Sequence, residues 1–244
     1  DIDPTRSRPE FEAAILDDLT WLGLDWPRPQ QRQSPRMGAY RAAADELRTR
    51  DLLYPCFCSR RDGVNSALAF DPDGAPLYSG RCRSLTAGQA DVRLRRGDPA
   101  QWRIKMDRAV AEAGAIAVME APSSGRDALW HRAALRAVAP AEWGDAVIVR
   151  KDTPTSYHLS VVVDDAAQGV THITRGADLY AATSLHALLQ KLLGLPAPLY
   201  CHHRLVLDEL GRKLSKSKGA PSLESLRNAG WTAEAVRRLL GFET

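Results

Sequence analysis

The sequence lacks the features that would place it in a membrane or among disordered proteins. No apolar run approaches the length of a membrane span, the first residues do not resemble a signal peptide, and no internal repeat or low-complexity linker occurs. The composition, 44% apolar and 26% charged, is ordinary for a globular protein. A chain of 244 residues can bury one substantial core, or a core together with a small insert.

A strong excess of either charge is also missing, because 33 Lys and Arg against 30 Asp and Glu leave a net charge of only +3. Composition alone therefore does not indicate a nucleic-acid partner. Arginines do cluster locally, at residues 60–61, 81–83, 93–96 and 237–238. Each cluster taken alone is more typical of a solvated face than of a binding site.

Cysteine is scarce, with four in the chain. Without a secretory context they favour reduced thiols or a metal site over disulfides, and we expect the protein in the cytoplasm. Cys56, Cys58 and Cys82 are close enough in sequence to supply soft ligands to a structural Zn²⁺, which usually takes four donors. No histidine lies in this stretch, so the residues alone leave the fourth donor open, and a cluster of buried free cysteines is the alternative.

A basic loop near the end of the chain carries the clearest chemical signal. Residues 213–217 read KLSKS, and Gly219 follows. Two ammonium groups three residues apart, separated by short side chains, suit a polyphosphate whose leaving group gains charge. A solvated basic loop is the alternative, since short motifs often match by chance.

Residues 213–217 resemble the KMSKS loop of class I aminoacyl-tRNA synthetases, with Leu214 in the Met position. Residues 1–6, 156–165 and 169–179 are similar to segments of the glutamyl branch of that class. Four segments in the right order over nearly the whole chain are far more specific than one motif. Within this branch the chain most resembles the short glutamyl-queuosine tRNA(Asp) synthetase family.

The resemblance implies an ATP-dependent ligase that activates glutamate, with Mg²⁺ accompanying the ATP. The glutamate would then be transferred to the queuosine base in the anticodon loop of tRNA(Asp). The implied partners are glutamate, ATP and queuosine-containing tRNA(Asp), with no membrane, and we expect a monomer.

Site residues follow from the resemblance position by position. Tyr157 and Arg175 match the glutamate site, and a guanidinium suits a carboxylate because it can donate two parallel hydrogen bonds. Lys216 matches the catalytic, ATP-contacting lysine, while Lys213 assists the leaving pyrophosphate and Ser215 completes the ATP site.

The family's metal site resembles Cys-x-Cys followed by Tyr-x3-Cys. Its ligands match Cys56, Cys58, Tyr78 and Cys82, which makes Tyr78 the predicted fourth donor.

The predicted fold is α/β: a Rossmann-like class I catalytic core with a small zinc-binding insert and a short C-terminal helical segment. Residues 1–50 would form part of the core, with its N-terminal portion missing, and 51–140 the zinc-bearing insert or acceptor-domain-like region. Residues 141–244 would form the second half of the core, with the KLSKS loop and terminal helices.

Apolar periodicity predicts helices over residues 11–22, 34–47 and 183–193 and a helical pair over 223–240. Ser34 and Pro35 have the residue types of an N-cap and first helical position. Strands are expected at 102–106, 146–150, 170–174 and 205–207. Residues 161–163, three valines, favour a strand by propensity, but the resemblance implies a helix beginning at Tyr157, and we follow the resemblance.

Two features depart from the family pattern. The HIGH-type signature on the other side of ATP is not found, and Asp1 lies inside what resembles a motif, so we interpret the sequence as incomplete. A protein that began at Asp1 is expected to be inactive, and ordinary turnover in an adenylation assay would contradict this. Fewer than thirty residues follow Ser217, whereas a conventional glutamyl-tRNA synthetase continues into a long helical anticodon-binding region.

Three alternatives remain open from the sequence. The chain could be a truncated conventional glutamyl-tRNA synthetase that charges the tRNA 3′ end. It could be a non-catalytic, zinc-containing tRNA-binding paralogue. It could also be a small-molecule ligase or nucleotidyltransferase that uses the same loop for ATP.

Overall fold

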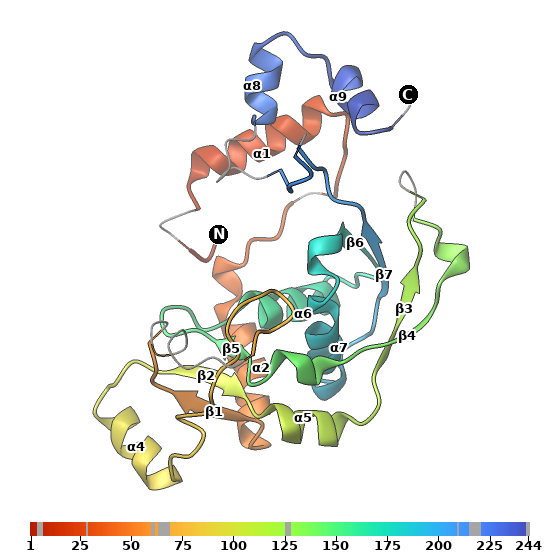
Figure 1. Cartoon of the computed structure of the whole chain (residues 1–244). Helices are drawn as coiled ribbons and strands as arrows, with labels where there is room; N and C mark the ends of the chain where they lie inside the picture. The colour runs from red at the N-terminus through yellow and green to blue at the C-terminus, as the bar shows by residue number, and fades with distance from the viewer. Residues whose placement is uncertain are drawn as a thin grey trace.

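The computed structural model describes residues 1–3, 7–27, 29–59, 62, 69–124, 128–208, 210–214 and 221–242. These residues form an α/β fold, as predicted (Figure 1). The α-helices are α1 (Pro9–Trp21), α2 (Met37–Thr49), α4 (Ala87–Arg95), α5 (Met106–Ala113), α6 (Tyr157–Ala167), α7 (Ala182–Leu192), α8 (Leu223–Asn228) and α9 (Ala233–Leu239). The 3₁₀ turns are η1 (Ser34–Arg36), η2 (Trp130–Arg132), η3 (Pro140–Trp143) and η4 (Ala177–Leu179).

The strands form two separate sheets. The smaller sheet is antiparallel and contains β1 (Leu53–Cys56), β2 (Gln101–Ile104) and β5 (Val147–Val149), in the order β1-β2-β5. The larger sheet is mixed and has the order β4-β3-β7-β6. Its strands are β3 (Ala117–Ala121), β4 (Ala134–Ala137), β6 (His172–Gly176) and β7 (Leu199–His203). The parallel pairs are β3 with β7 and β6 with β7, whereas β3 and β4 are antiparallel.

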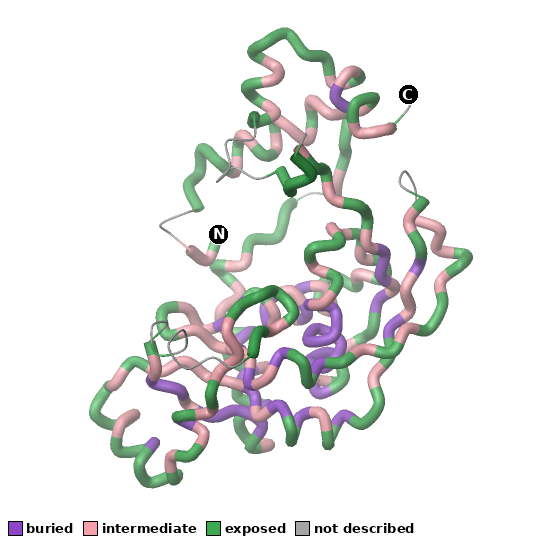
Figure 2. The backbone as a smooth tube through the Cα atoms, in the orientation of Figure 1, coloured by how far each residue is buried: buried purple, intermediate pink, exposed green. Residues whose placement is uncertain are grey.

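The main core lies where α2, α5, α6 and α7 meet, and Figure 2 shows buried backbone concentrated there. Leu159 of α6 and Leu185 and Leu188 of α7 are fully shielded from solvent. At about 25 cal/mol per Å² of apolar surface, burial of such side chains is the main favourable term for these helices. Helix α7 also contacts the larger sheet, because the Gln190 amide donates to the Tyr200 hydroxyl at 3.0 Å.

Residues 161–163, the run of three valines, are helical. The family resemblance implied a helix here, whereas strand propensity favoured a strand. The Ser156 hydroxyl accepts from the Leu159 amide at 3.5 Å and caps the start of α6. Val162 is then buried against the core on the same side as Leu159. Packing of this face outweighs the modest strand preference of valine.

Three local predictions were wrong in detail. Residues 34–36 form η1, and α2 begins only at Met37, because the Ser34 hydroxyl is directed to the Asp1 carboxylate and does not cap the helix. Met106 does not continue β2 but is the first residue of α5. The expected strand at 205–207 is reduced to a bridge between Leu207 and Lys213, and the regular strand lies earlier, at Leu199–His203.

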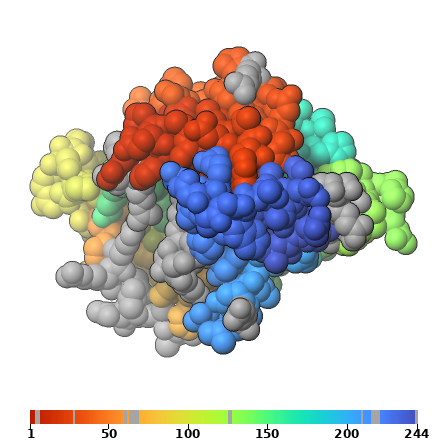
Figure 3. Space-filling model, turned by 90° about the horizontal axis from the view of Figure 1, so that it is seen from above, coloured from red at the N-terminus to blue at the C-terminus, as the bar shows by residue number. Residues whose placement is uncertain are grey.

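Segments from opposite ends of the chain lie side by side. Figure 3 shows the N-terminal residues against the C-terminal helices, and Arg237 of α9 donates to the Leu22 carbonyl at 2.7 Å. Arg227 of α8 forms an ion pair with Asp18 of α1 at 3.4 Å. None of the described helices is long and apolar enough to span a membrane.

A buried carboxylate ties α6 to the segment that leads into α2. Asp164 accepts a hydrogen bond from the Tyr40 hydroxyl at 2.7 Å, from Arg36 Nε at 2.7 Å and from the Gln33 amide at 2.9 Å. Tyr40 is fully buried, and burial together with the Asp164 bond raises its pKa to about 12. Tyr40 therefore acts as a permanent donor at neutral pH.

Replacing this carboxylate should weaken the fold far more than removing one donor. We expect Asp164→Ala to lower the free energy of unfolding by about 3 kcal/mol, because it leaves a buried hydroxyl and a guanidinium without their acceptor. Tyr40→Phe, the matched control, should cost about 1 kcal/mol, since Asp164 keeps its other two donors. Urea unfolding of both variants measures the difference, and equal losses would contradict this account.

Candidate active site

The site is built where β6 and β7 run in parallel. Their register places Arg175 opposite His202, next to the carboxyl ends of both strands. Ligands of open α/β sheets usually bind outside these ends. A Cβ on the next residue, Gly176, would lie 2.4 Å from Asp178 Oδ1, so a larger residue there would require this carboxylate to move.

Arg175 is held by three hydrogen bonds from its guanidinium. Nε donates to His202 Nε2 at 3.2 Å, and Nη1 donates to His186 Nδ1 at 2.9 Å. Nη2 donates to the Thr183 hydroxyl at 2.5 Å. Among the described residues, no carboxylate forms a direct ion pair with Arg175, and the Asp165 carboxylate interacts with its charge through space.

The contacts continue beyond these partners. His186 Nε2 lies 3.1 Å from His158 Nδ1, and His202 Nδ1 lies 2.7 Å from Glu120 Oε1. The other oxygen of Glu120 accepts from Arg136 at 3.2 Å. The network thus joins β3, β4, β6, β7, α6 and α7.

The three histidines of this network are neutral at ordinary pH. Burial, helped by the nearby Arg175 charge, lowers the pKa of His158 to about 4. The same two causes lower the pKa of His186 well below its usual value. Burial also lowers the pKa of His202, although the contact with Glu120 opposes the shift.

Tyr157, the other predicted glutamate-binding residue, is brought near Arg175. It is the first residue of α6 and is 47% exposed. Its ring meets the His186 ring edge-on, with 5.5 Å between centroids. His186 therefore touches both predicted residues.

Of the predicted ATP-binding residues, Lys213 lies in the described part of the chain, whereas Ser215 and Lys216 lie outside it. Lys213 forms an ion pair with Asp178, the second residue of η4. This contact lowers the pKa of the Asp178 carboxyl and brings the start of the lysine loop to the end of β6. Asp178 therefore contacts the loop, whereas the contacts of His172 are with Thr171 and the Trp130 ring.

The predicted metal ligands gather in a second cluster. Ligand atoms of Cys56, Cys58 and Cys82 all lie within 4.8 Å of one another. The Tyr78 hydroxyl is 3.4 Å from Cys58 Sγ and accepts from the Cys82 amide at 2.7 Å. Three neighbouring sulfurs are chemically suited to Zn²⁺, and the Tyr78 phenol oxygen lies beside them.

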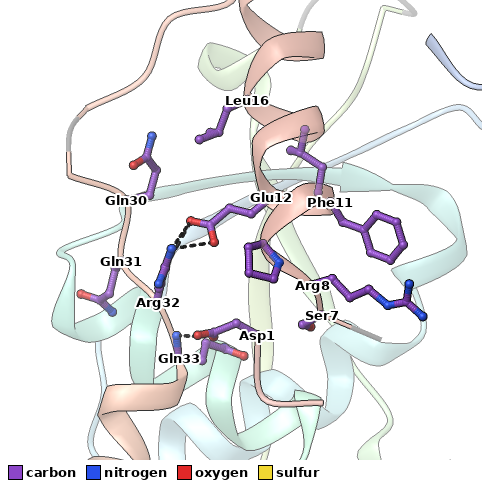
Figure 4. A pocket seen from close by; sticks show the side chains of 12 residues that line it. Asp1, Ser7, Arg8, Phe11, Glu12, Leu16, Gln30, Gln31, Arg32 and Gln33 are labelled. Carbon is purple, nitrogen blue, oxygen red and sulfur yellow. Dashed lines mark hydrogen bonds and ion pairs between the residues drawn. The ribbon is translucent and has the colours of Figure 1, made fainter. Parts of the chain in front are cut away.

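A pocket of about 610 Å³ opens elsewhere, between α1 and residues 30–33 (Figure 4). Glu12 and Arg32 pair across it through hydrogen bonds of 2.7 and 2.9 Å. Phe11, Ile15 and Leu16 give it an apolar side. None of the predicted site residues lines it, so its size does not identify the reaction centre.

Residues beyond the sequence-predicted site also take part in the network, namely Glu120, His158, Thr183, His186 and His202. The sequence held one indication of the network residues that lie on α7. Helix α7 is buried almost throughout yet contains Thr183, Ser184, His186 and Gln190, and buried polar side chains require internal partners.

Comparison with known proteins gives a consistent result. Residues 1–242 match the family of class I tRNA synthetases (E and Q), catalytic domain. A glutamyl-Q tRNA(Asp) synthetase from Rhodobacter capsulatus is 43% identical, over 99% of this chain and 85% of that protein. A glutamate–tRNA ligase from Aquifex aeolicus is 35% identical, over 97% of this chain but only 47% of its own length.

The fold has a counterpart among solved structures. A glutamate tRNA ligase from Elizabethkingia meningosepticum, solved in complex with its amino acid, superimposes with a TM-score of 0.70. It is 23% identical, and the match covers 98% of this chain and 52% of that one. At this identity the likeness concerns the fold alone.

The buried histidines make stability depend on pH. Because the pKa of His158 falls from 6.5 to about 4 on folding, the unfolded chain binds a proton in this window that the folded chain does not. Stability from this group is complete above pH 6.5, and the free energy of unfolding falls below it by about 1.4 kcal/mol per pH unit.

The matched variant His158→Gln should show a shallower fall over the same window, which urea unfolding at several pH values measures. Identical slopes in the two proteins would show that His158 does not remain neutral on folding.

Proposed function

The chain belongs to the class I tRNA synthetases of the glutamate and glutamine group, and we propose that it activates glutamate with ATP for transfer to the queuosine base of tRNA(Asp). The observation that carries the proposal is the match to a glutamyl-Q tRNA(Asp) synthetase, at 43% identity over 85% of that protein. Other relatives named in the same way, from Janthinobacterium and Nocardia farcinica, are each 39% identical.

Arg175 supports an acidic amino acid as the substrate. Among the described residues no carboxylate pairs with it directly, although Asp165 acts on it through space, and its three nitrogens are fixed by neutral acceptors. Of the five N–H groups of a guanidinium, two remain for a ligand, which is the number a bidentate carboxylate requires. We assign the side-chain carboxylate of glutamate to Arg175 and a flanking contact to the half-exposed Tyr157.

Activation requires the α-carboxylate of glutamate to attack the α-phosphate of ATP while pyrophosphate leaves. The protein supplies positioning and cationic groups and needs little acid–base chemistry. In this proposal Lys213, Lys216 and Ser215 contact the phosphates, with Mg²⁺ bound to ATP. Lys213 is paired with Asp178 in the structure, and its ammonium has further N–H donors for a phosphate.

We also propose that residues 51–140 contain a structural zinc site. Cys56, Cys58, Cys82 and Tyr78 would hold the ion, and the close sulfurs and the inward phenol oxygen support this donor set. The ion would tie the end of β1 to the loop that carries Tyr78 and Cys82. A monomer in the cytoplasm remains our prediction.

A conventional glutamate–tRNA ligase is the nearest alternative, because such proteins are also similar at 35% identity. The deciding experiment uses the protein expressed from its native gene, labelled glutamate, ATP and two pools of tRNA. One pool comes from cells that make queuosine and the other from cells that cannot. We expect label only on the queuosine-containing pool, and we expect it to disappear when the modified base is removed.

The other outcomes identify the alternatives. Label at the 3′ end in both pools would indicate conventional charging. Bound tRNA without label and without pyrophosphate exchange would indicate a non-catalytic paralogue. Activation of another acid with no requirement for tRNA would indicate a small-molecule ligase.

The metal proposal has its own test. Mass spectrometry of the purified protein should find one zinc ion per chain, and Cys82→Ser should lose it because a donor is missing. Cys201→Ala is the matched control, since Cys201 is a buried cysteine in β7 outside the cluster, and it should retain the ion. A wild-type protein free of zinc after growth with zinc would contradict the proposal.

A further inference from the structure

The hydrogen bonds around Arg175 indicate the tautomers of His202 and His186, and the Thr183 hydroxyl also lies 3.0 Å from His202 Nε2. A guanidinium only donates, so His202 Nε2 and His186 Nδ1, which face Arg175, must both be acceptors. Neutral imidazole carries one N–H, so His202 is protonated on Nδ1 and His186 on Nε2. The first donates to Glu120 at 2.7 Å and the second to His158 at 3.1 Å.

Glu120 therefore acts on Arg175 through His202. If His202 carried its proton on Nε2 instead, two N–H groups would face each other across the 3.2 Å contact with Arg175. The Glu120 carboxylate prevents this because it accepts only from a protonated Nδ1. This is the arrangement by which a second group fixes the tautomer of a functional imidazole.

The charge of Glu120 is paired with Arg136 and not with Arg175. Its second oxygen pairs with Arg136, whose guanidinium stacks 4.1 Å from the Tyr180 ring centroid. The negative charge is thus matched by Arg136, and the imidazole that separates Glu120 from Arg175 is neutral. The orientation of Arg175 is thus fixed by hydrogen bonds without a direct ion pair to a carboxylate.

The side chains that contact Arg175 are buried. Thr183 is fully buried, His186 is 1% exposed and the His202 side chain is 4% exposed. Rotation of Arg175 would leave the buried His186 Nδ1 without its donor, whereas the Thr183 hydroxyl, 3.0 Å from His202 Nε2, would remain beside that nitrogen.

We propose that Glu120 and His202 are positioning residues that hold Arg175 as an oriented cation without a direct ion pair and so set the affinity for the side-chain carboxylate of the substrate. The proposal rests on the proposed function for the identity of that substrate, glutamate. It adds a role for two residues that do not themselves contact the ligand. The direct acceptors of Arg175 are neutral, and the nearby Asp165 carboxylate acts on it only through space, so a ligand carboxylate can form its direct ion pair.

The first test does not depend on catalysis. Nitrogen-15 NMR of the labelled protein from its native gene distinguishes the two tautomers and the imidazolium by their ring-nitrogen shifts. We expect His202 to be the Nδ1–H tautomer and His186 the Nε2–H tautomer at neutral pH. Imidazolium at His202, or the opposite tautomer, would overturn the proposal whether or not the protein uses glutamate.

The second test compares His202→Leu with His202→Gln by ATP–pyrophosphate exchange. Leucine removes the acceptor, whereas a glutamine carbonyl can approach the place of Nε2. We expect the KM for glutamate to rise about tenfold in His202→Leu, the loss of one charge-assisted hydrogen bond, with the KM for ATP unchanged. His202→Gln should recover most of this loss. Equal effects of the two substitutions, or a loss shared equally by glutamate and ATP, would indicate a merely structural role.

Glu120→Leu tests the same hydrogen bond, from Arg175 to His202, by a different substitution. It should raise the KM for glutamate in the same direction, and the double variant with His202→Leu should be no worse than the more affected single variant, because both act through one contact. Additive effects would contradict the relay. Absence of exchange in the wild-type protein would count against the proposed function, and the tautomer measurement would still decide the positioning role.

Discussion

The parallel register of β6 and β7 is the constraint on which the rest of the site depends. It sets Arg175 beside His202, and the other contacts of the guanidinium follow from α7, which packs against the same sheet. A shift of one residue would turn Arg175 to the opposite face, because side chains alternate along a strand. The site is therefore a product of strand pairing as much as of residue identity. Asp178 lies two residues after the end of β6 and pairs with Lys213, so it connects this site to the lysine loop.

The two clusters of functional residues are stabilised by different means. Around Arg175 the side chains of His186, Thr183 and His202 find partners within the protein, and the network joins elements far apart in sequence. The sulfur cluster instead draws its three cysteines and Tyr78 from a short part of the chain and forms its own small core with Phe57. An ion bound there would add local stability to a region poor in large apolar side chains, without direct contact with the guanidinium.

Much of this organisation could be predicted from the sequence. The α/β class, the helices at α1 and α7, the parallel strand at β6 and the family were confirmed. What could not be predicted depends on contacts between distant segments. The bond of Ser34 to Asp1 removes it as a helix cap, and the roles of His202 and Glu120 depend on pairing between strands 82 residues apart. Residues 84–142 gave the weakest sequence signals, and two strands of the larger sheet, β3 and β4, come from this stretch.

The buried polar residues of α7 have a consequence for how substrate preference can change during evolution or design. Specificity is usually sought on the rim of a pocket, where side chains can be exchanged freely. In the proposed function the charge that selects the ligand is anchored from inside the core, and exchanging Arg175 for an apolar residue would leave the buried His186 Nδ1 without its donor. A change of substrate would therefore require simultaneous substitutions on β6, β7 and α7. A single substitution at Arg175 would not be enough.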